Sequence, residues 1–144
     1  MTQQNYSNHK RIVPMYHVVT FLIIVLLFIS SAYYTYAAYK KGLSMRPELF
    51  FVLTSVVLFS LFTYVRVFSL KAQDRAIRAE ENFRHYLLTG KPLDSKLTMR
   101  QIIGLRFASD EELPELAKKA AESGMSEDEI KKSIKNWKAD NNRA

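Results

Sequence analysis

Two long, nearly uncharged stretches dominate the pattern of apolar and polar positions along the chain. No Asp, Glu, Lys or Arg occurs between Ile12 and Tyr39, and the second stretch, Leu49 to Leu70, carries no charge before Arg66. About 20 apolar residues suffice to cross a bilayer as a helix. The pattern therefore predicts two transmembrane helices, over about residues 16–39 and 49–70.

Residues suited to the membrane–water interface lie near the ends of these predicted spans. A tyrosine ring is apolar while its hydroxyl stays hydrated, and an arginine one turn from a helix end can snorkel to the headgroups. These membrane-interface candidates are Tyr16, Tyr33, Tyr34, Tyr36, Tyr39 and Arg66. The short polar segment Lys40–Pro47 makes the two spans antiparallel neighbours.

A cleaved secretory signal is the main alternative for the first apolar stretch. Lys10 and Arg11 would be its basic region and Ser30-Ser31-Ala32 its cleavage site. The apolar stretch continues past Ala32 into an aromatic cluster, which favours a retained span. A pair of buried core helices is a further alternative, but so short a chain has too little polar surface to cover them.

The distribution of positive charge predicts the orientation of the two spans. Seven Lys or Arg residues lie in or beside the flanks that share a side with both termini, and three lie in the loop between the spans. Because cytoplasmic flanks carry the excess of positive charge, we expect both termini on the cytoplasmic side.

The pattern in the second half of the chain predicts helices that face water. No helix breaker separates the second span from Leu88, so residues 71–90 are expected to form a cytosolic stem that stops at Gly90. Two acid-to-base pairs at i,i+4, Asp74 with Arg78 and Glu80 with Arg84, fit an exposed helix.

Residues 91–144 are expected to form a small domain of three helices. Capping boxes begin at Thr98 with Gln101, at Ser109 with Glu112 and at Ser126 with Glu129. Gly124 should end the middle helix. The predicted core consists of Ile102, Ile103, Leu105, Phe107, Leu113, Leu116, Ile130, Ile134 and Trp137, with the last three on one helical face.

The expected fold is all-α: a transmembrane hairpin whose second helix extends into a stem, followed by that small domain. The expected division is residues 1–70, 71–90 and 91–144. Net charge is +5 over residues 1–70, +4 over 71–106 and −2 over 107–144. A positive excess beside the spans fits an anionic membrane surface and argues against nucleic-acid binding. The chain has no cysteine, which excludes disulfides and thiolate metal sites.

Catalytic chemistry has no clear signature in this sequence. The glycines are scattered, so no phosphate-binding loop is predicted, and no cofactor is expected. His9 and His17 are weak candidates for a metal site, though an interfacial polar pair is the simpler interpretation. The acids at 110–112 could bind a cation, but acids opening a helix usually only cap it.

Three segments resemble a known group of proteins. They are Asn5-Tyr6-x-Asn8-His9, Gln73-Asp74-Arg75-x-Ile77-Arg78-x-Glu80-Glu81 and residues 105–112, Leu-Arg-Phe-Ala-Ser-Asp-Glu-Glu. They are similar to an uncharacterised family of small bacterial two-span membrane proteins, known only as a domain of unknown function. The resemblance implies a bacterial cytoplasmic membrane setting and no reaction.

An apolar stripe with steps of three and four follows the second span into the stem. It contains Leu58, Leu61, Val65, Phe68, Ala72, Ala76, Ala79, Phe83 and Tyr86. This spacing is typical of a coiled-coil seam, so a parallel homodimer is one interpretation. The favoured interpretation is internal: the stripe faces the first span and then the distal helices, because its cytosolic part covers barely two heptads.

These observations favour a non-enzymatic, membrane-anchored interaction or regulatory module. The candidate interaction residues are Ala72, Ala76, Ala79, Phe83 and Trp137. The expected partners are the lipid bilayer and an unidentified protein. An accessory subunit of a membrane transporter or envelope complex is the alternative. A lipid-headgroup enzyme that uses His9, His17 or the acids at 110–112 is the third possibility.

Overall fold

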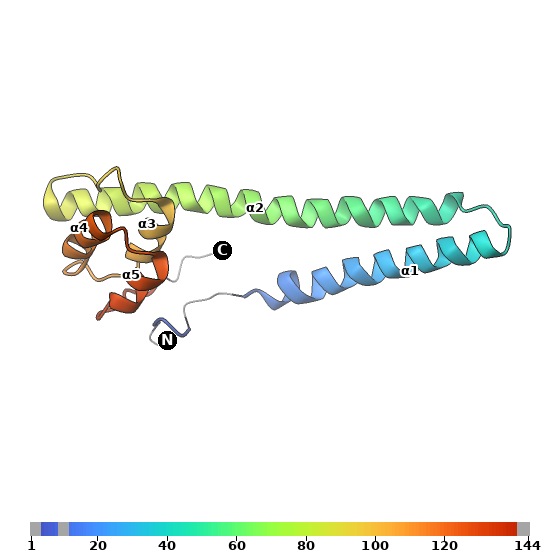
Figure 1. Cartoon of the computed structure of the whole chain (residues 1–144), viewed down its shortest axis with the longest axis horizontal. Coiled ribbons are helices and arrows are strands. Elements are labelled where there is room, and N and C mark those ends of the chain that lie inside the picture. Colours follow the sequence, from blue (N-terminus) through green and yellow to red (C-terminus); the bar gives the residue numbers. More distant parts are fainter. Residues whose placement is uncertain (1–3, 9–11, 141–144) are drawn as a thin grey trace. The chain divides into compact units, whose positions relative to one another are not determined.

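The computed structural model describes residues 4–8 and 12–140, and over these residues the chain is helical without a β-strand. The elements in chain order are a π-helical segment η1 (Met15–Thr20), α1 (Phe21–Lys40), α2 (Arg46–Thr89), α3 (Met99–Leu105), α4 (Leu113–Ser123) and α5 (Glu127–Ser133) (Figure 1). The predicted all-helical class is confirmed. The chain divides into two compact units: Ile12–Ser69, and Met1–Arg11 with Leu70–Ala144. We call these the hairpin unit and the distal unit.

The hairpin unit consists of η1, α1 and the first part of α2, which run antiparallel on either side of a short turn (Figure 1). Gly42 takes a φ of 66° in this turn, a conformation that glycine adopts without strain. Helix α2 begins at Arg46, three residues before the predicted span. A proline is tolerated in the first helical turn, so Pro47 lies inside the helix instead of ending the loop.

Small side chains form much of the interior of the hairpin unit. Ser55 is 1% exposed and Ser31 6%, and Ile24 and Ala38 are also buried. Because the hairpin unit is built from α1 and the first part of α2, these buried residues mark the side on which each helix packs against the other. Neither hydroxyl is left unsatisfied: Ser31 donates to the Phe28 carbonyl at 2.9 Å and Ser55 to the Val52 carbonyl at 2.7 Å.

Most other side chains of α1 and of residues 46–69 are both apolar and exposed. Ile23 is 60% exposed, Leu26 61% and Phe50 70%. By length and composition, Met15–Lys40 and Arg46–Thr89 are two helices that could cross a membrane.

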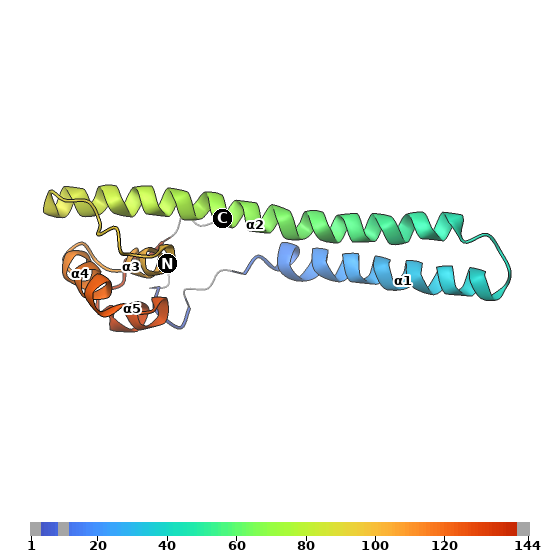
Figure 2. The same ribbon diagram turned by 45° about the horizontal axis from the view of Figure 1, so that its top comes forward.

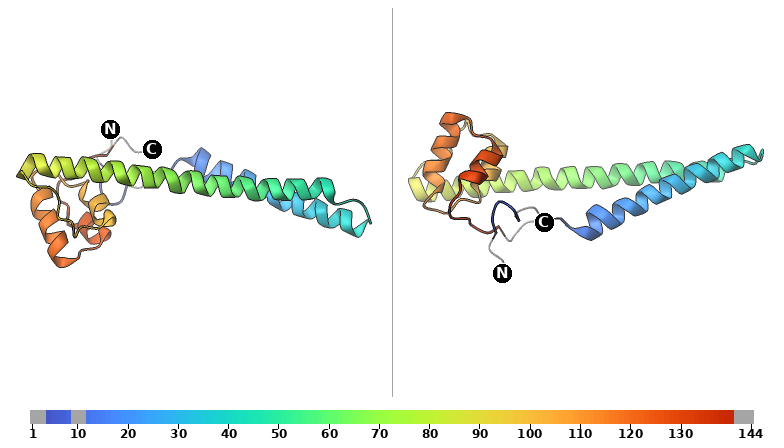
Figure 3. Two further views of the ribbon diagram at one scale, coloured as in Figure 1. Left: turned by 90° about the horizontal axis from the view of Figure 1, so that it is seen from above. Right: turned by 60° about the horizontal axis from the view of Figure 1, so that its bottom comes forward.

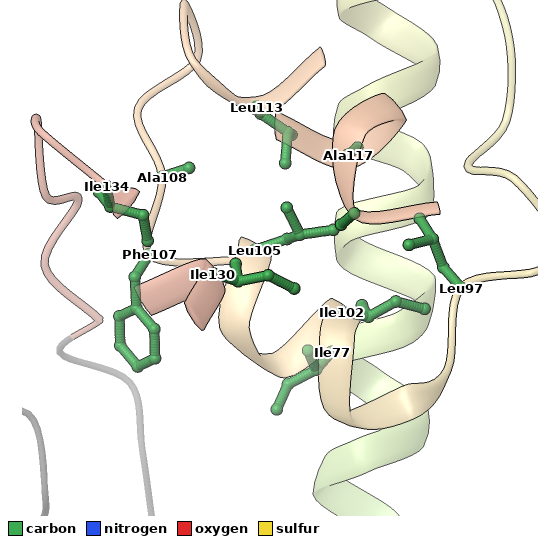
Figure 4. Close-up of a cluster of buried hydrophobic side chains, with 11 residues drawn as sticks. Ile77, Leu97, Ile102, Leu105, Phe107, Ala108, Leu113, Ala117, Ile130 and Ile134 are labelled. Atoms are coloured by element: carbon green, nitrogen blue, oxygen red, sulfur yellow. The ribbon is translucent and has the colours of Figure 1, made fainter. Parts of the chain in front are cut away.

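The distal unit forms around the three short helices and the last part of α2 (Figures 2 and 3). Ile77 of α2 joins a core built mainly from α3, α4 and α5 (Figure 4). Gly104 permits the close approach of α3 to α5, since a Cβ there would lie 3.2 Å from the Glu127 carbonyl oxygen and from Ile130 Cγ2. The predicted core residues that are buried are Ile102, Leu105, Phe107, Leu113, Ile130 and Ile134, while Ile103, Leu116 and Trp137 are partly buried.

Four helix boundaries in the distal unit lie where the sequence signals predict them. The capping boxes at Thr98 and Ser126 are both complete, with the side chain of each cap and of its partner bonded reciprocally. Gly90 follows the end of α2 with a φ of 71°, and Gly124 caps α4 with a φ of 62°. These four predictions are confirmed.

The predicted capping box at Ser109 is wrong. Helix α4 begins at Leu113, and Glu112 occupies the cap position without a side-chain cap. The Ser109 hydroxyl does accept from the Glu112 amide at 3.4 Å, but the Glu112 carboxylate bonds elsewhere. Half of the motif is therefore used, and its glutamate is recruited by another segment.

Trp137 is not on a helical face with Ile130 and Ile134, which corrects a second prediction. Helix α5 ends at Ser133, and Ile134 is already extended, with φ −69° and ψ 123°. Trp137 lies in the extended segment that follows and pairs with Ala108 in an isolated antiparallel bridge. Its ring packs 5.1 Å from the Phe107 ring and is half-buried, so it closes the edge of the core.

Candidate functional site

Arg84 ties the stem to the distal helices. Its Nε donates to Asp110 Oδ1 at 2.6 Å, its Nη1 to Glu81 Oε2 at 2.9 Å and its Nη2 to the Ala108 carbonyl at 2.7 Å. The side chain is 12% exposed, so the charge is largely removed from water and is balanced by two carboxylates. A planar guanidinium can satisfy three acceptors in fixed directions, which a lysine cannot.

This arrangement replaces the ion pairs expected from the stem sequence. No Glu80–Arg84 or Asp74–Arg78 pair forms within the described residues. Arg84 turns to Glu81, and Arg78 Nη2 donates to the Leu97 carbonyl at 3.4 Å. The i,i+4 rule gives the preference of an isolated helix, whereas here a neighbouring segment offers acceptors closer to the core.

The Glu112 carboxylate accepts hydrogen bonds that hold the segment after α5 at the start of α4. Its Oε2 accepts from the Lys135 amide at 3.1 Å, and its Oε1 accepts from the Asn136 amide and from Asn136 Nδ2, both at 3.1 Å. The bridge between Ala108 and Trp137 is reinforced by the Lys138 amide, which donates to the Phe107 carbonyl at 2.8 Å. Two of the acids at 110–112 therefore act as structural ties.

A cavity of about 590 Å³ lies between the stem and the segment after α5. Its walls come from Gln73, Ala76, Ile77, Glu80, Glu81, Phe83, Arg84, Leu87, Arg106, Lys138, Ala139 and Asp140. Charged residues of both signs line it, and Arg106 Nη1 contacts Asp140 Oδ2 at 3.1 Å. Among the described residues that line it there is no serine, threonine, cysteine or histidine.

Three exposed carboxyl groups in the distal unit have lowered pKa values. The hydrogen bond from Arg84 lowers the pKa of Asp110 below its ordinary 3.8. The Ser109 hydroxyl lowers the pKa of Glu111, and the Ser126 backbone amide lowers the pKa of Glu129, both from an ordinary 4.5. In each case the charged carboxylate is the form that accepts the hydrogen bond.

These shifts predict acid sensitivity of the distal unit. With folded pKa values below the unfolded ones, the unfolded chain binds more protons, so the stabilisation is present above the ordinary values and is lost as pH falls through the lowered ones. Urea unfolding followed by Trp137 fluorescence should show a lower midpoint at acidic pH than at pH 7. Glu129→Gln keeps a side chain that can complete the capping box but cannot titrate, so its midpoint should fall less with pH. An equal fall in both proteins would contradict this origin.

The distal helices do not bury the apolar stripe of the stem. Ala72, Ala76 and Ala79 are exposed, as are Phe83 at 63% and Tyr86 at 53%. The residues of α2 that contact the distal helices and loops are instead Ile77, Arg78, Asn82, Arg84 and His85. The favoured internal interpretation is therefore wrong as regards a buried contact with the distal helices, although Ala76 and Phe83 border the cavity that Arg106 and residues 138–140 also line.

The same correction holds in the hairpin unit. Leu58, Leu61, Val65 and Phe68 are all exposed, between 39% and 61%. The covered side of this part of α2 carries Ser55, which is buried, and Phe62, whose carbonyl accepts from the Tyr16 hydroxyl at 2.6 Å. Because almost every position of a span is apolar, steps of three and four can be read on more than one face.

The remaining predicted residues are dispersed. Tyr16 is held by Phe62, with the rings stacked at 4.5 Å, while Tyr33, Tyr34, Tyr36 and Tyr39 are exposed and Arg66 is half-buried. His17 Nδ1 lies 3.1 Å from the Val13 amide nitrogen, which makes it a local helix contact. His9 lies outside the described residues. Within 4–8 and 12–140, no three His, Cys, Asp or Glu side chains form a group that could hold a metal ion.

Sequence reasoning did not find Arg84 and Glu112 as tertiary ties. The acids at 110–112 were visible in the sequence, but their partners could not be named, since a basic residue on any neighbouring element could satisfy them.

The profile of a protein family described as a family of unknown function, DUF6526, matches residues 1–144. No curated protein and no solved structure matches the chain.

Proposed function

The chain belongs to the DUF6526 family of unknown function, and we propose that it is a membrane-anchored, non-enzymatic interaction or regulatory module. In this proposal α1 and the first part of α2 cross the bacterial cytoplasmic membrane as a hairpin, and the distal unit carries the interaction in the cytosol. The observation that carries it is the exposed apolar surface of the hairpin unit. In the most apolar 18-residue stretch of each candidate span, the buried share is 11% in the first span and 6% in the second.

Water is a poor solvent for such a surface. Contiguous exposed apolar patches on soluble monomers rarely exceed a few hundred Å². In the hairpin unit the exposed side chains lie on both helices and include Ile23, Leu26, Phe50 and Leu53. Hydrocarbon covers such a surface without a protein partner.

Hydroxyl groups on the exposed faces are satisfied in the way that lipid requires. Thr54, Ser60, Thr63 and Ser69 each donate to the carbonyl four residues earlier, over 2.7 to 2.9 Å. A hydroxyl in hydrocarbon has no water to bond, so a bond within its own helix removes the cost of burying it. This pattern supports lipid-facing helices.

The distal unit supports an interaction role. It has a core, complete capping boxes at α3 and α5, and hydrogen bonds that hold the distal helices to the stem. The basic residues of the stem, Lys71, Arg75 and Arg78, would lie near an anionic cytoplasmic leaflet.

The proposal makes a topology prediction. A cysteine introduced as Ser44→Cys, in the turn before α2, should react with a membrane-impermeant maleimide in intact cells. Ser123→Cys, at the end of α4, should react only after the cells are broken, since both termini are placed in the cytoplasm. The chain has no other cysteine, so each variant reports a single position.

Two other results would contradict parts of the proposal. Labelling of Ser123→Cys but not Ser44→Cys in intact cells would reverse the orientation. Complete extraction of the wild-type chain by alkaline carbonate, which removes peripheral proteins, would overturn the membrane proposal itself.

A further inference from the structure

One side of the stem is apolar and exposed, and it lies opposite the residues of α2 that contact the distal helices. At about 100° per residue, the stripe of Ala72, Ala76, Ala79, Phe83 and Tyr86 is centred about 150° around α2 from Ile77, Glu81 and Arg84. Leu87, at the edge of the stripe, is 68% exposed. Ala76, Phe83 and Leu87 border the cavity that Arg106 and residues 138–140 also line, but the distal unit does not bury them.

We propose that this stripe is a parallel homodimer interface, in which the stem of a second copy of the chain packs against it. The occupant is identified by the charges that border the stripe. With Ala76 and Ala79 as the a and d positions of a heptad, Arg75 takes position g and Glu80 the following position e. In a parallel coiled coil these are the positions that pair between helices, so each Arg75 faces the Glu80 of the other copy.

Neither of these two charged residues forms an ion pair within the described residues, although Glu80 borders the cavity beside the distal segment. Both are exposed. By contrast, Glu81 and Arg84, on the other side of the stem, pair at 2.9 Å. An interface that is symmetric about a two-fold axis would use the Arg75–Glu80 pair twice.

The spacing of the stripe also fits a seam that changes period. The steps are three and four up to Ala72, then four to Ala76, and three and four again to Tyr86. The added step of four is a stutter, which locally unwinds a coiled coil without interrupting its apolar seam. The alanines lie at the centre of the cytosolic part, where they permit close approach, and Phe83 and Tyr86 fill the wider part beyond.

The parallel orientation rests on the proposed membrane hairpin. Two copies inserted in the same direction present their stems side by side, and confinement to one bilayer raises their effective concentration. This confinement compensates for the shortness of the cytosolic seam, which alone would be a weak dimerisation element.

Disulfide trapping in lipid vesicles tests the interface. The full-length chain, reconstituted in phosphatidylethanolamine and phosphatidylglycerol vesicles, would carry Ala76→Cys, Ala79→Cys or Phe83→Cys one at a time. We expect dimers to form on mild oxidation at all three positions. Leu88→Cys is the matched control, since it is exposed on the same stem but about 160° from the stripe, and should give at least fivefold less dimer. Equal yields at all four positions, or none at the three seam positions, would overturn the proposal.

Charge reversal tests the choice of a second copy as partner. Arg75→Glu places like charges across the seam, and should lower the dimer yield of the Ala79→Cys chain by about fivefold. Adding Glu80→Arg should restore it, a rescue that a loss of folding would not allow. If the double variant stays as low as the single one, the paired register is wrong.

A third variant separates dimer loss from unfolding and from failure to insert. Ala79→Glu should give monomers in vesicles, because it places a charge within the apolar stripe. The distal unit should stay folded, because Ala79 does not line the cavity beside the distal segment. Trp137 fluorescence should be unchanged, which shows that the distal unit stays folded. Carbonate resistance of the same sample tests membrane insertion. Carbonate-resistant wild-type chains that remain monomeric would overturn the dimer and leave the proposed function standing.

Discussion

Replacement of Phe107 by alanine should lower the free energy of unfolding of the distal unit by about 3–5 kcal/mol, the usual cost of removing a buried phenylalanine ring. The Phe107 side chain is fully buried, and it contacts Trp137 on one side and the Arg106 guanidinium, 4.7 Å from its centroid, on another. Removal of the ring would leave a cavity in the core, and α5 and the extended segment would lose the side chain against which they pack.

The measurement is urea unfolding of the full chain in detergent, followed by the fluorescence of Trp137, the chain's single tryptophan. Phe83→Ala makes the same substitution at a side chain 63% exposed. Under conditions where the chain is monomeric, it should change stability by less than about 0.5 kcal/mol. If the two variants unfold at the same urea concentration, the assignment of Phe107 to the core is wrong.

The location of Trp137 changes the expectation for that residue as well. A tryptophan central to the core would cost about 3 kcal/mol or more on replacement by alanine. Because the observed ring is half-buried at the edge of the core, we expect Trp137→Ala to cost less than Phe107→Ala. Far-UV circular dichroism, which needs no tryptophan, would rank the two.

Loss of Arg84 is the second large effect that we expect. Arg84→Ala should destabilise the distal unit by about 3 kcal/mol, because it removes three hydrogen bonds and leaves Glu81, whose side chain is 13% exposed, without its cation. Arg84→Lys keeps the charge but cannot reach three acceptors in the geometry of a guanidinium, so it should recover only part of the loss.

Arg100→Ala is the matched control for this prediction. The Arg100 side chain is 81% exposed and meets Glu127 at 3.4 Å, so its removal should cost under about 1 kcal/mol. Limited proteolysis in the loop after Gly90 should increase in Arg84→Ala, since Arg84 links the stem to Asp110 and Ala108 beyond that loop. An unchanged unfolding midpoint and cleavage rate in Arg84→Ala would show that the stem holds the distal helices without it.

Local sequence determined the ends of α2 and α4 and the starts of α3 and α5. Gly90 and Gly124 end helices because only a residue without a Cβ adopts positive φ cheaply, and Thr98 and Ser126 begin them because their hydroxyls satisfy free backbone amides. These effects act over three or four residues, so neighbours in sequence suffice to specify them. The two apolar helices follow in the same way from composition and length.

Only the tertiary structure decided which side of each helix is covered and which charges pair. Along α2 the apolar period admits more than one covered face, and the choice of the face with Ser55 and Ile77 depends on what packs there. Arg84 and Glu112 each had a plausible partner nearby in sequence. Arg84 bonds to Asp110 and Ala108 as well as to nearby Glu81, and the Glu112 carboxylate bonds to the segment after α5. Buried charges take the partners that geometry brings within hydrogen-bonding distance, and that proximity is a property of the packed chain.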